Sequence, residues 1–466
     1  MSLYSSRLYR YSPVLLQNAA TSFKGLLSRV TRRKRGFSNV LAQIRAREAL
    51  TAEGIRDFQS RELRSMIAHA ATNVSYYRKL FEECNLSASM IQCPEDLKKL
   101  PYLEKEPLRT QPSQFVPTNI KKWLLIRAST SGSTGTPLQL YRTLDSVINE
   151  HAYVWRQFAW AGCSPGDRIV ALRGDVVVPS SQRTPPFWRH NLAENTLIMS
   201  SYHIAENTIP FYIAAIRDFQ PTLIYAYPSA VYPVAEHVVR RKLAREFPSL
   251  RGIVTSSETL LATQREVIEE AMGCRVFDWY GQAERVVFIG TCEHGSHHVF
   301  DDYGVTEFVP IGDNRYEVVG TGFTNYGMPL IRYKTGDVVE LCPQDQCRCG
   351  RAFKVVAAVE GRKEDMVTLG NGKLVGRLDL IFKGLKGIRE AQIIQQTFGD
   401  IVIRVVVDES FVEGTLRKIT DNARLRLGDE VRVQVEIVDL IPRGTSGKLK
   451  AVVSLLNKEN SHTGRF

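Results

Sequence analysis

The sequence predicts an α/β protein in which a large N-terminal domain precedes a small α+β C-terminal domain. Between about residues 121 and 340, short apolar runs alternate with segments of helical periodicity, and this alternation is typical of βαβ units that share a largely parallel sheet. From about residue 361 the pattern changes to strand-like runs around two helical segments. A chain of 466 residues is also too long for one ordinary core, so more than one domain is expected.

The predicted elements divide the chain into an extension (1–50), a large domain (51–360) and a small domain (361–466). Residues 51–120 favour helices and turns. The strand-like runs of the large domain are Trp123–Ala128, Arg168–Leu172, Thr222–Tyr225, Gly252–Thr255 and Arg275–Asp278. Those of the small domain are Ala391–Gln396, Ile401–Val407 and Val431–Val438, with helices near 376–385 and 411–427.

The N-terminal extension carries most of the net charge. Residues 1–50 hold ten Lys or Arg and one acid, Glu48, which is a net +9 out of the chain's +12. The basic run Arg32–Arg35 follows an apolar series at helical spacing. This series is Leu15, Leu16, Ala19, Phe23, Leu26, Leu27 and Val30. The sequence favours a helix that packs on the protein with a solvated basic end, and it leaves open a peripheral contact of residues 1–40 with an anionic membrane surface.

The bulk composition is that of a soluble globular protein, with 44% hydrophobic and 24% charged residues. No apolar run approaches the roughly 18 residues of a membrane span, and the N-terminus lacks the pattern of a signal peptide. We therefore expect a cytoplasmic protein, at most peripheral at the inner face of the membrane, with its eight cysteines reduced. Nucleic-acid binding is not expected, because no aromatic residues are interleaved with the basic run. The sequence predicts no oligomeric state.

A loop rich in glycine and hydroxyl side chains follows the first strand-like run. Glycines let the backbone approach an anion closely, and hydroxyls and successive N–H groups donate to phosphate oxygens. The loop lacks the Lys-Ser/Thr pair of a Walker loop, so the lysine for a phosphate must come from elsewhere in the chain. The candidate phosphate-binding residues are Thr130, Ser131, Gly132, Ser133, Thr134, Gly135 and Thr136.

Five motifs in order resemble those of the acyl-activating adenylate-forming superfamily, which includes acyl-CoA synthetases, adenylation domains and luciferases. They span about 320 residues, so their order is more specific than any one motif. The motifs are the loop Thr130–Pro137, Tyr280–Glu284, Tyr333–Asp337, Gly361–Asp365 and Pro442–Lys448. Gln282-Ala283 replaces the usual x-Thr, and Leu138 stands where many relatives carry lysine. Neither change removes a charge that the chemistry needs.

Further segments resemble the phenylacetate–CoA ligase-like group and, within it, the CapK-like members of capsular-polysaccharide biosynthesis. These segments are Tyr76–Arg78, Leu97–Leu103 with Lys105, Tyr227–Ser229 and Cys347–Arg351. The resemblance covers about residues 50–456. It implies a large multi-layer N-terminal domain of the adenylate-forming type and a mobile C-terminal domain.

The resemblance also implies an activity. It is the ATP-dependent activation of a small carboxylic acid as an acyl-adenylate, with release of pyrophosphate, followed by acyl transfer to CoA. Transfer to an amine or amino sugar is the alternative within this class, and a role in polysaccharide biosynthesis is possible for either. Outside the enzyme class, the alternative is an inactive relative that acts as a surface-associated binding protein.

The same resemblance assigns roles to individual residues. Glu284 would bind Mg²⁺, and Lys448 would supply the missing catalytic cation from the C-terminal domain. Asp337 would accept from the ribose hydroxyls, and Arg362 would donate to ribose or phosphate. Glu364 or Asp365 would be the hinge. The adenine pocket would be lined by Ser256, Ser257, Glu258, Tyr280, Gly281 and Gln282.

Two short clusters predict a structural zinc site. Zinc takes four Cys or His ligands, usually from two such clusters, and Cys292, Cys347 and Cys349 supply three of them. The resemblance places the fourth at His298, with His294 and Cys342 as competitors. Four protein ligands leave no open position for a substrate, so the role would be structural.

The acid-binding pocket is expected near residues 202–229 and 255–284. Its candidate lining residues are Tyr202, His203, Tyr225 and Tyr227, which are equally typical of core positions. These side chains do not choose between an aryl acid and a small polar acid.

Overall fold

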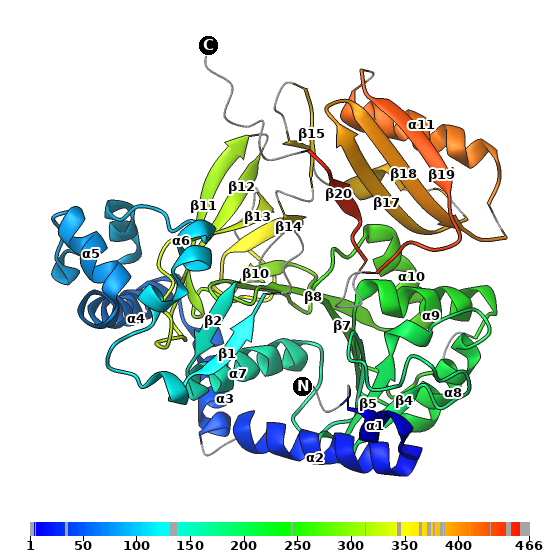
Figure 1. Ribbon diagram of the computed structural model, residues 1–466, viewed down its shortest axis with the longest axis horizontal. Helices are drawn as coiled ribbons and strands as arrows, with labels where there is room; N and C mark the ends of the chain where they lie inside the picture. The colour runs from blue at the N-terminus through cyan, green and yellow to red at the C-terminus, as the bar shows by residue number, and fades with distance from the viewer. Residues whose placement is uncertain are drawn as a thin grey trace.

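A mixed sheet of twelve strands organises the large domain, as the computed structural model shows (Figure 1). The order across the sheet is β11-β12-β13-β14-β10-β9-β8-β7-β6-β3-β5-β4. In chain order the strands are β3 (Ile169–Arg173), β4 (Trp188–Asn191), β5 (Thr196–Ser200), β6 (Leu223–Ala226), β7 (Gly252–Ser256), β8 (Arg275–Gly281), β9 (Phe288–Thr291), β10 (His297–Val299), β11 (Gly304–Gly312), β12 (Arg315–Gly322), β13 (Tyr333–Leu341) and β14 (Val355–Arg362).

The structure describes most of the chain. The described residues are 4, 6–32, 36–130, 138–243, 246–312, 314–342, 346–362, 366–370, 374–375, 378–382, 385, 387–409, 411–428, 430–443 and 449–456. None of the helices in these ranges has both the length and the apolar content needed to cross a bilayer.

Only the section β8-β7-β6-β3-β5 of the large sheet is parallel. The strands predicted here, β3, β6, β7 and β8, are confirmed. Their sequence signal is strong because strands that are buried on both faces are continuous apolar runs. The remaining described pairs of the sheet are antiparallel. The expectation of a strand over Trp123–Ala128 in this sheet is wrong. Residues Lys122–Leu124 form a 3-10 helix, and β1 (Ile126–Ser129) pairs only with β2 (Gln139–Arg142) in the described chain.

Helices cover both faces of the parallel section, because alternate side chains of each strand point to opposite faces. Ile224 and Ile253 pack in the apolar cluster with α8 (Ile209–Phe219), α9 (Pro228–Arg240) and α10 (Ala262–Met272). Their neighbours Leu223 and Val254 pack in the cluster with α3 (Phe37–Ala46) and α7 (Leu144–Trp160).

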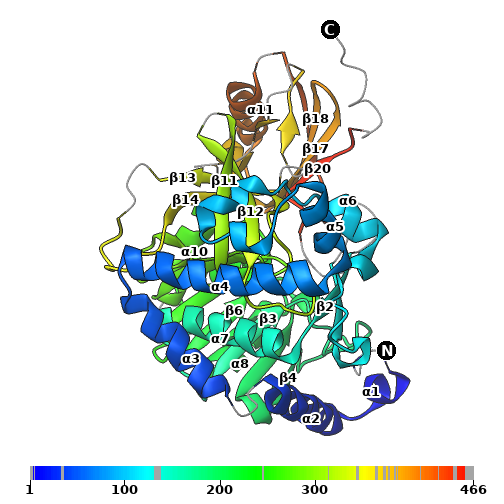
Figure 2. The same cartoon turned by 90° about the vertical axis from the view of Figure 1, so that its left-hand side faces the viewer.

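The remaining helices of the large domain surround this core. Helices α4 (Ala52–Asn73) and α5 (Ser75–Glu83) pack in one cluster with the antiparallel strands, and α6 (Lys105–Thr110) follows them. In the extension, α2 (Val14–Arg32) lies along β4 and α1 (Arg7–Tyr11) packs against α2, at the end of the molecule opposite the C-terminal domain (Figures 1 and 2). Further 3-10 helices are η2 (Arg47–Ala49), η3 (Ala88–Met90), η4 (Pro94–Lys99), η5 (Pro112–Phe115), η7 (Leu192–Glu194) and η8 (Ser201–His203).

The smaller C-terminal domain follows β14. Its four-stranded sheet has the order β19-β18-β17-β20, and α11 (Gly414–Leu427) packs on it. The strands are β17 (Ile388–Thr397), β18 (Asp400–Val407), β19 (Arg432–Ile437) and β20 (Val452–Ser454), with a hairpin of β15 (Val367–Thr368) and β16 (Leu374–Val375). The helix expected near 376–385 is described only as the 3-10 helix η10 (Leu378–Phe382). The apolar core of this domain uses its own residues, from Val367 to Val452.

Candidate active site

The β1–β2 hairpin positions the candidate phosphate loop. Ser129 pairs with Gln139, and the Thr130 N–H donates to the Leu138 carbonyl at 3.2 Å. The Leu138 N–H in turn donates to Thr130 Oγ1 at 3.0 Å. These bonds close the hairpin at both ends of the loop. The predicted phosphate ligands from Ser131 to Thr136 lie outside the described residues.

Two motif residues that are far apart in the sequence meet through Tyr280. The Tyr280 hydroxyl, at the end of β8, donates to Asp337 Oδ2 on β13 at 2.6 Å. Burial and the charge of Asp337 raise the pKa of Tyr280 well above its usual value. The predicted adenine and ribose residues therefore form one hydrogen-bonded pair, which orients both side chains. Gln282 Nε2 is 3.4 Å from the same hydroxyl, and Gly281 is exposed at the end of β8.

Glu284 is held in the same way by a second tyrosine. The Tyr333 hydroxyl donates to Glu284 Oε1 at 3.0 Å, and the carboxylate is half-buried. A positioned, partly exposed carboxylate is a suitable ligand for Mg²⁺. Beside it, the Arg142 guanidinium of β2 donates to the Ala283 carbonyl. Burial lowers the pKa of Arg142 to about 10. Arg142 links the hairpin to the Tyr280–Glu284 motif, and the sequence analysis did not identify it.

Ser256, Ser257 and Glu258 follow one another at the end of β7, but they have different surroundings. Ser256 is 1% exposed, with its hydroxyl 3.3 Å from that of Tyr225. Ser257 is exposed and has φ +72°, a left-handed conformation that costs free energy in a non-glycine residue.

Glu258 connects three parts of the chain. Its carboxylate accepts from the backbone N–H and the hydroxyl of Ser229, both at 3.0 Å, at the start of α9. It also accepts from the backbone N–H of Leu449 at 3.0 Å. In this structure Glu258 therefore joins the large domain to the C-terminal segment, a role that the adenine-pocket assignment did not anticipate.

The Pro442–Lys448 motif is described only in part. Lys448 lies outside the described residues, as do the predicted hinge residues Glu364 and Asp365. Contacts fix the chain on either side of this segment. Arg443 forms an ion pair with Glu390 of its own domain, and the Leu449 N–H donates to Glu258.

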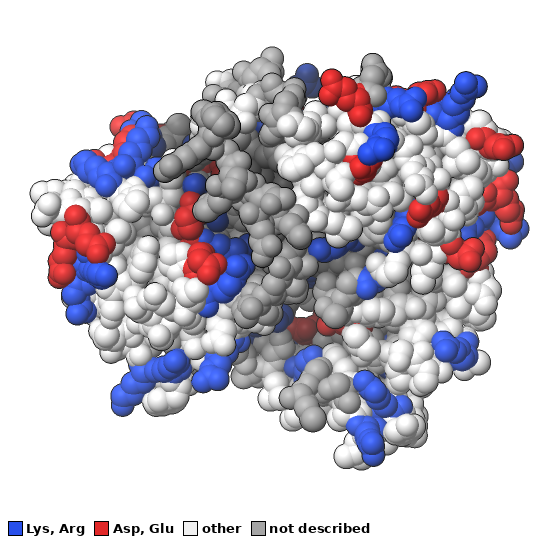
Figure 3. Space-filling model, turned by 45° about the horizontal axis from the view of Figure 1, so that its top comes forward, with Lys and Arg blue, Asp and Glu red and all other residues white. Residues whose placement is uncertain are grey.

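Arg362 ends β14, and its Cα is in register with that of Asp337. Figure 3 shows a hollow in this face of the molecule, with Lys and Arg side chains at its margins and Asp or Glu side chains within it.

The structure brings two of the four predicted acid-pocket residues, Tyr225 and Tyr227, against one arginine, and the hydroxyl of a third, Tyr202, donates to the carbonyl of the next residue, Gly174, at 3.4 Å. Arg173, the last residue of β3, donates through Nη1 to the Tyr225 hydroxyl at 2.6 Å, and its guanidinium lies 5.0 Å from the centre of the Tyr227 ring. Burial and the nearby Tyr227 raise the pKa of Tyr202. His203 has different neighbours, because it stacks on Phe187 at 5.3 Å and its Nδ1 is 2.7 Å from the Ser200 hydroxyl.

Arg173 itself is absent from the sequence prediction. Its Nη2 donates to Ser257 Oγ at 3.2 Å, whereas its buried Nε has no hydrogen-bond partner among the described residues. The available signal was its position, because a charged residue at the carboxyl end of a buried parallel strand lies at the edge where ligands bind in open α/β sheets.

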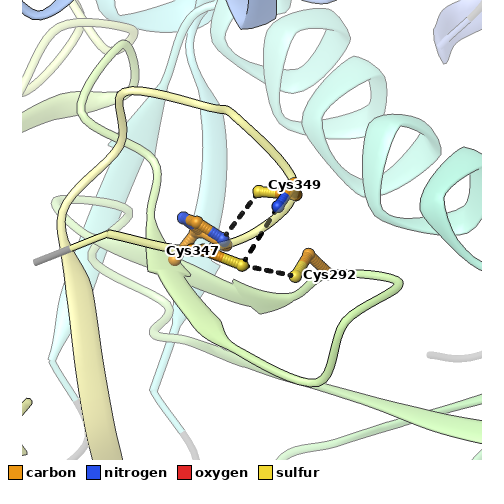
Figure 4. A group of neighbouring side chains, drawn as sticks. Cys292, Cys347 and Cys349 are labelled. Carbon is orange, nitrogen blue, oxygen red and sulfur yellow. Dashed lines mark hydrogen bonds between the residues drawn. The ribbon is translucent and has the colours of Figure 1, made fainter. Parts of the chain in front are cut away.

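The four predicted zinc ligands lie together. The candidate ligand atoms of Cys292, His298, Cys347 and Cys349 are all within 4.8 Å of one another, and Figure 4 shows the three cysteines side by side. The Sγ atoms of Cys292 and Cys347 are 3.6 Å apart, too far for a disulfide. Cys349 Sγ is 3.3 Å from His298 Nε2. The competitors His294 and Cys342 are not members of the cluster.

The fold is that of the adenylate-forming ligases. Residues 57–326 match the model of the AMP-binding enzyme family, and residues 367–455 match that of the CapK C-terminal domain. The chain belongs to the AMP-binding enzyme family, which confirms the resemblance that the motifs indicated.

The relatives come from both predicted branches. The chain is 25% identical to Protein CapK of Staphylococcus aureus over 451 residues, which is 96% of this chain and 98% of that protein. It is 25% identical to the phenylacetate-coenzyme A ligase of Thermus thermophilus over 445 residues, which is 88% of this chain and 98% of that protein.

Structures of one ligase in two states resemble this protein to different degrees. A 2-hydroxyisobutyryl-CoA ligase in the postadenylation state, in complex with 2-HIB-AMP, has a TM-score of 0.69 at 21% identity, with 88% of this chain and 91% of that chain covered. The same ligase in the thioesterification state, at the same identity and coverage, has a TM-score of 0.54.

Proposed function

We propose that this protein is an ATP-dependent ligase that activates a carboxylic acid as an acyl-adenylate and transfers the acyl group to CoA. The observation that carries the proposal is the convergence of two tyrosine–carboxylate pairs, Tyr280–Asp337 and Tyr333–Glu284, beside the β1–β2 hairpin. The pairs unite two of the five motifs, and Arg142 links them to the hairpin that carries a third. Positioned polar groups of this kind act on developing charge without having to reorganise during the reaction.

In the first step, a carboxylate oxygen of the acid attacks the α-phosphorus of ATP, and the bond to pyrophosphate breaks. The Thr130–Thr136 loop would bind the phosphates, and Asp337 would accept from the ribose. Glu284 would hold Mg²⁺, which neutralises phosphate charge when bound. Lys448 would supply the cation that the loop lacks. In the second step the CoA sulfur attacks the acyl carbon, AMP leaves, and the thiol proton is released.

The domain arrangement supports an assignment of the conformational state. The match to the postadenylation state of the 2-hydroxyisobutyryl-CoA ligase exceeds that to its thioesterification state, with TM-scores of 0.69 and 0.54. The two structures are of one ligase in two states, so a different orientation of the domains accounts for the difference. We infer that the C-terminal domain here has the adenylation-side orientation, and that a rotation near Glu364 and Asp365 precedes thioester formation.

The phenylacetate-coenzyme A ligase relatives support CoA as the acceptor, whereas a role in polysaccharide biosynthesis rests on the resemblance to CapK. Both parts of the proposal are tested with the full-length protein, ATP and Mg²⁺. ATP–pyrophosphate exchange is measured with a panel of aryl, hydroxy, amino and fatty acids, and CoA or an amine is then added. We expect exchange with at least one acid and an acyl-CoA product. Absence of exchange with every acid would contradict the ligase, and an amide product without a thioester would replace the acceptor.

Arg173 supports a polar acid as the substrate. Its Nε is buried and has no hydrogen-bond partner among the described residues. A buried donor without an acceptor destabilises a protein, and a polar group on the acid would supply that acceptor. We expect Arg173→Met to raise KM at least roughly tenfold for acids with a hydroxyl or second carboxyl group, since one lost charged hydrogen bond is worth about 1.5–3 kcal/mol. Unsubstituted acids should be little affected. Arg168→Met, at the other end of the same strand run, is the control, and an equal effect on both classes of acid contradicts the assignment.

We also propose that Cys292, His298, Cys347 and Cys349 bind a structural zinc ion. Tetrahedral zinc–sulfur bonds of about 2.3 Å require sulfur atoms about 3.8 Å apart, close to the 3.6 Å between Cys292 and Cys347. His298 Nδ1 lies 3.3 Å from the Phe353 carbonyl, a bond that orients Nε2 toward the sulfur atoms, as in many zinc sites.

Metal analysis tests the zinc proposal. We expect about one zinc per chain in the wild type, much less in Cys347→Ser, and an unchanged amount in Cys84→Ser, whose sulfur lies outside the cluster. Removal of the metal by a chelator should lower the melting temperature of the wild type and leave that of Cys347→Ser unaffected. A wild-type content well below one ion would contradict the site.

A further inference from the structure

Helix α2 is oriented with its polar side toward the protein. Its buried residues are Gln17, Thr21 and Gly25, one from each successive turn. A Cβ added at Gly25 would lie only 2.1 Å from the Asn191 side chain, so the helix backbone approaches the β4 segment very closely. An amphipathic helix of a globular protein normally turns its apolar side inward. The arrangement here is the reverse.

Specific hydrogen bonds hold the helix in this orientation. Gln17 Oε1 accepts from the buried Arg189 Nε at 2.5 Å. Asn18 Oδ1 accepts from the His190 N–H at 3.0 Å, and Ser22 Oγ accepts from the Leu192 N–H, also at 3.0 Å. The bonds come from two neighbouring turns of α2 and reach residues in or directly after β4. The orientation of the helix is therefore set by matched partners and not by loose contact.

The apolar side of α1 and α2 points to solvent as a consequence. We call these side chains the apolar face. Leu15 is 81% exposed, Phe23 62% and Val30 58%. The other members are Leu8, Tyr11, Leu16, Leu26 and Leu27. A contiguous exposed apolar surface of this kind marks an interaction site in a soluble protein.

Cations border the apolar face. Arg7, Arg10, Lys24, Arg29 and Arg32 are all exposed, and the sequence contains no acid before Glu48. A groove of about 610 Å³ continues the face between α2 and α3, where Leu26, Val30 and Leu41 line it together with Arg29 and Arg45. The cations of α1 and α2 outnumber the acids near them, which are Asp175 and Glu194. Exposed apolar side chains with an excess of cations match a surface of acyl chains beneath anionic headgroups.

We propose that the apolar face docks this protein on an anionic lipid membrane. A second copy fits less well, because a two-fold contact of this face would bring its own cations together. The face lies at the end opposite the C-terminal domain (Figures 1 and 2). Docking there would leave the domain interface accessible. The proposal is independent of the ligase activity.

Vesicle co-sedimentation of the full-length protein tests the proposal. We expect binding to phosphatidylcholine vesicles that contain phosphatidylserine, little binding to phosphatidylcholine alone, and a loss of binding as NaCl is raised from 0.1 to about 0.5 M. Phe23→Ser/Leu27→Ser should lower the partition coefficient at least roughly tenfold. Leu425→Ser, at an exposed leucine of α11 (88% exposed), should leave it unchanged.

Controls separate a docking defect from misfolding and from self-association. Because Phe23 and Leu27 are exposed, the double variant should keep the wild-type melting temperature. Equal vesicle binding by the wild type and the double variant would overturn the proposal. So would an absence of binding to anionic vesicles together with a dimer, in analytical ultracentrifugation, that the double variant abolishes. In that case a second copy of the chain covers the face.

Discussion

The interior of the large domain and its contact with the C-terminal domain are built from the same charged groups in different settings. Arg156 and Asp302 have no exposed side-chain surface, and two bonds of 3.0 Å join them within one packed core. Arg389 and Glu206 join the domains at 3.6 Å, and their side chains are 33% and 44% exposed. The first pair is fully desolvated and makes two hydrogen bonds, whereas the second is partly exposed to solvent and its charges are farther apart.

The difference indicates which part of the site is preformed. No apolar cluster among the described residues crosses between the domains, since the small domain's cluster begins at Val367 and the others end by Val359. The Tyr280–Asp337 and Tyr333–Glu284 pairs belong entirely to the rigid side. A rotation of the C-terminal domain would break polar contacts such as Arg389–Glu206 and Leu449–Glu258, which water can replace. The comparison therefore predicts a fixed half-site and a separable one.

The largest expected effect is on the rigid side. Asp302→Ala leaves the Arg156 charge buried and unpaired, and we expect it to lower the free energy of unfolding by about 3–5 kcal/mol. Urea denaturation measures this change. Asp218→Ala, at an exposed pair with Arg217, should change it by less than about 1 kcal/mol. If the two variants are equally stable, the interior pair does not have the role assigned to it.

Lys448→Ala separates the two half-sites by their chemistry. We expect ATP–pyrophosphate exchange to fall roughly 10²–10³-fold, because a cation that stabilises the transferring phosphate is lost. Formation of thioester from a supplied acyl-adenylate should remain within about threefold, since this step follows the rotation. Lys418→Ala, exposed on α11, is the control. Exchange that survives in Lys448→Ala would place the catalytic cation elsewhere.

Asp278 gives the rigid side a pH dependence. Burial raises its pKa from 3.8 to about 7, although Thr255 donates a hydrogen bond to it. Between pH 4 and 7 the Asp278 carboxyl binds fewer protons in the unfolded chain than in the folded one, so its contribution to stability should fall as the pH rises, by at most about 1.4 kcal/mol per unit. Asp278→Asn should flatten this slope in thermal unfolding across the same range. An unchanged slope would assign the dependence to another group.

The smallest expected effect on stability is at the domain interface. Arg389→Ala should change the free energy of unfolding by less than about 1 kcal/mol, because the pair is exposed. The ratio of adenylation to thioester formation should still shift by a few-fold, because one orientation of the domains loses a contact. Arg432→Ala removes a pair inside the small domain and should leave the ratio unchanged. A large loss of stability in Arg389→Ala would mean that the interface is not separable.

Much of the fold could be predicted where one signal was sufficient. Strands β3, β6, β7 and β8 are continuous apolar runs, and the structure places them at nearly the predicted bounds. The antiparallel strands β9 to β14 were missed, because glycines and motif residues interrupt their hydrophobic pattern. Which face of α2 is buried could not be predicted either. Periodicity defines an apolar face but does not say whether that face or the polar one finds partners, and here Arg189 and the β4 backbone select the polar side.

The parts of the candidate site that lie within sequence motifs could be predicted, and the parts outside them could not. The pairing of Tyr280 with Asp337 and the clustering of His298 with three cysteines agree with residues chosen from the sequence. Arg142 and Arg173 were missed because a single arginine at a strand end resembles any surface charge. Glu258 was assigned to the nucleotide, and its bond to Leu449 depends on a domain arrangement that no local pattern contains.

That bond has a consequence for how this family can diverge. Glu258 accepts from the main chain of Leu449 and not from its side chain. Nearly any amino acid at position 449 keeps the same N–H, and only proline removes it. The contact between the two domains can therefore outlast drift in the sequence of the C-terminal loop, provided that the carboxylate on the other side is retained. An alignment would therefore show a constraint at position 258 alone, although the contact in the structure involves both positions 258 and 449.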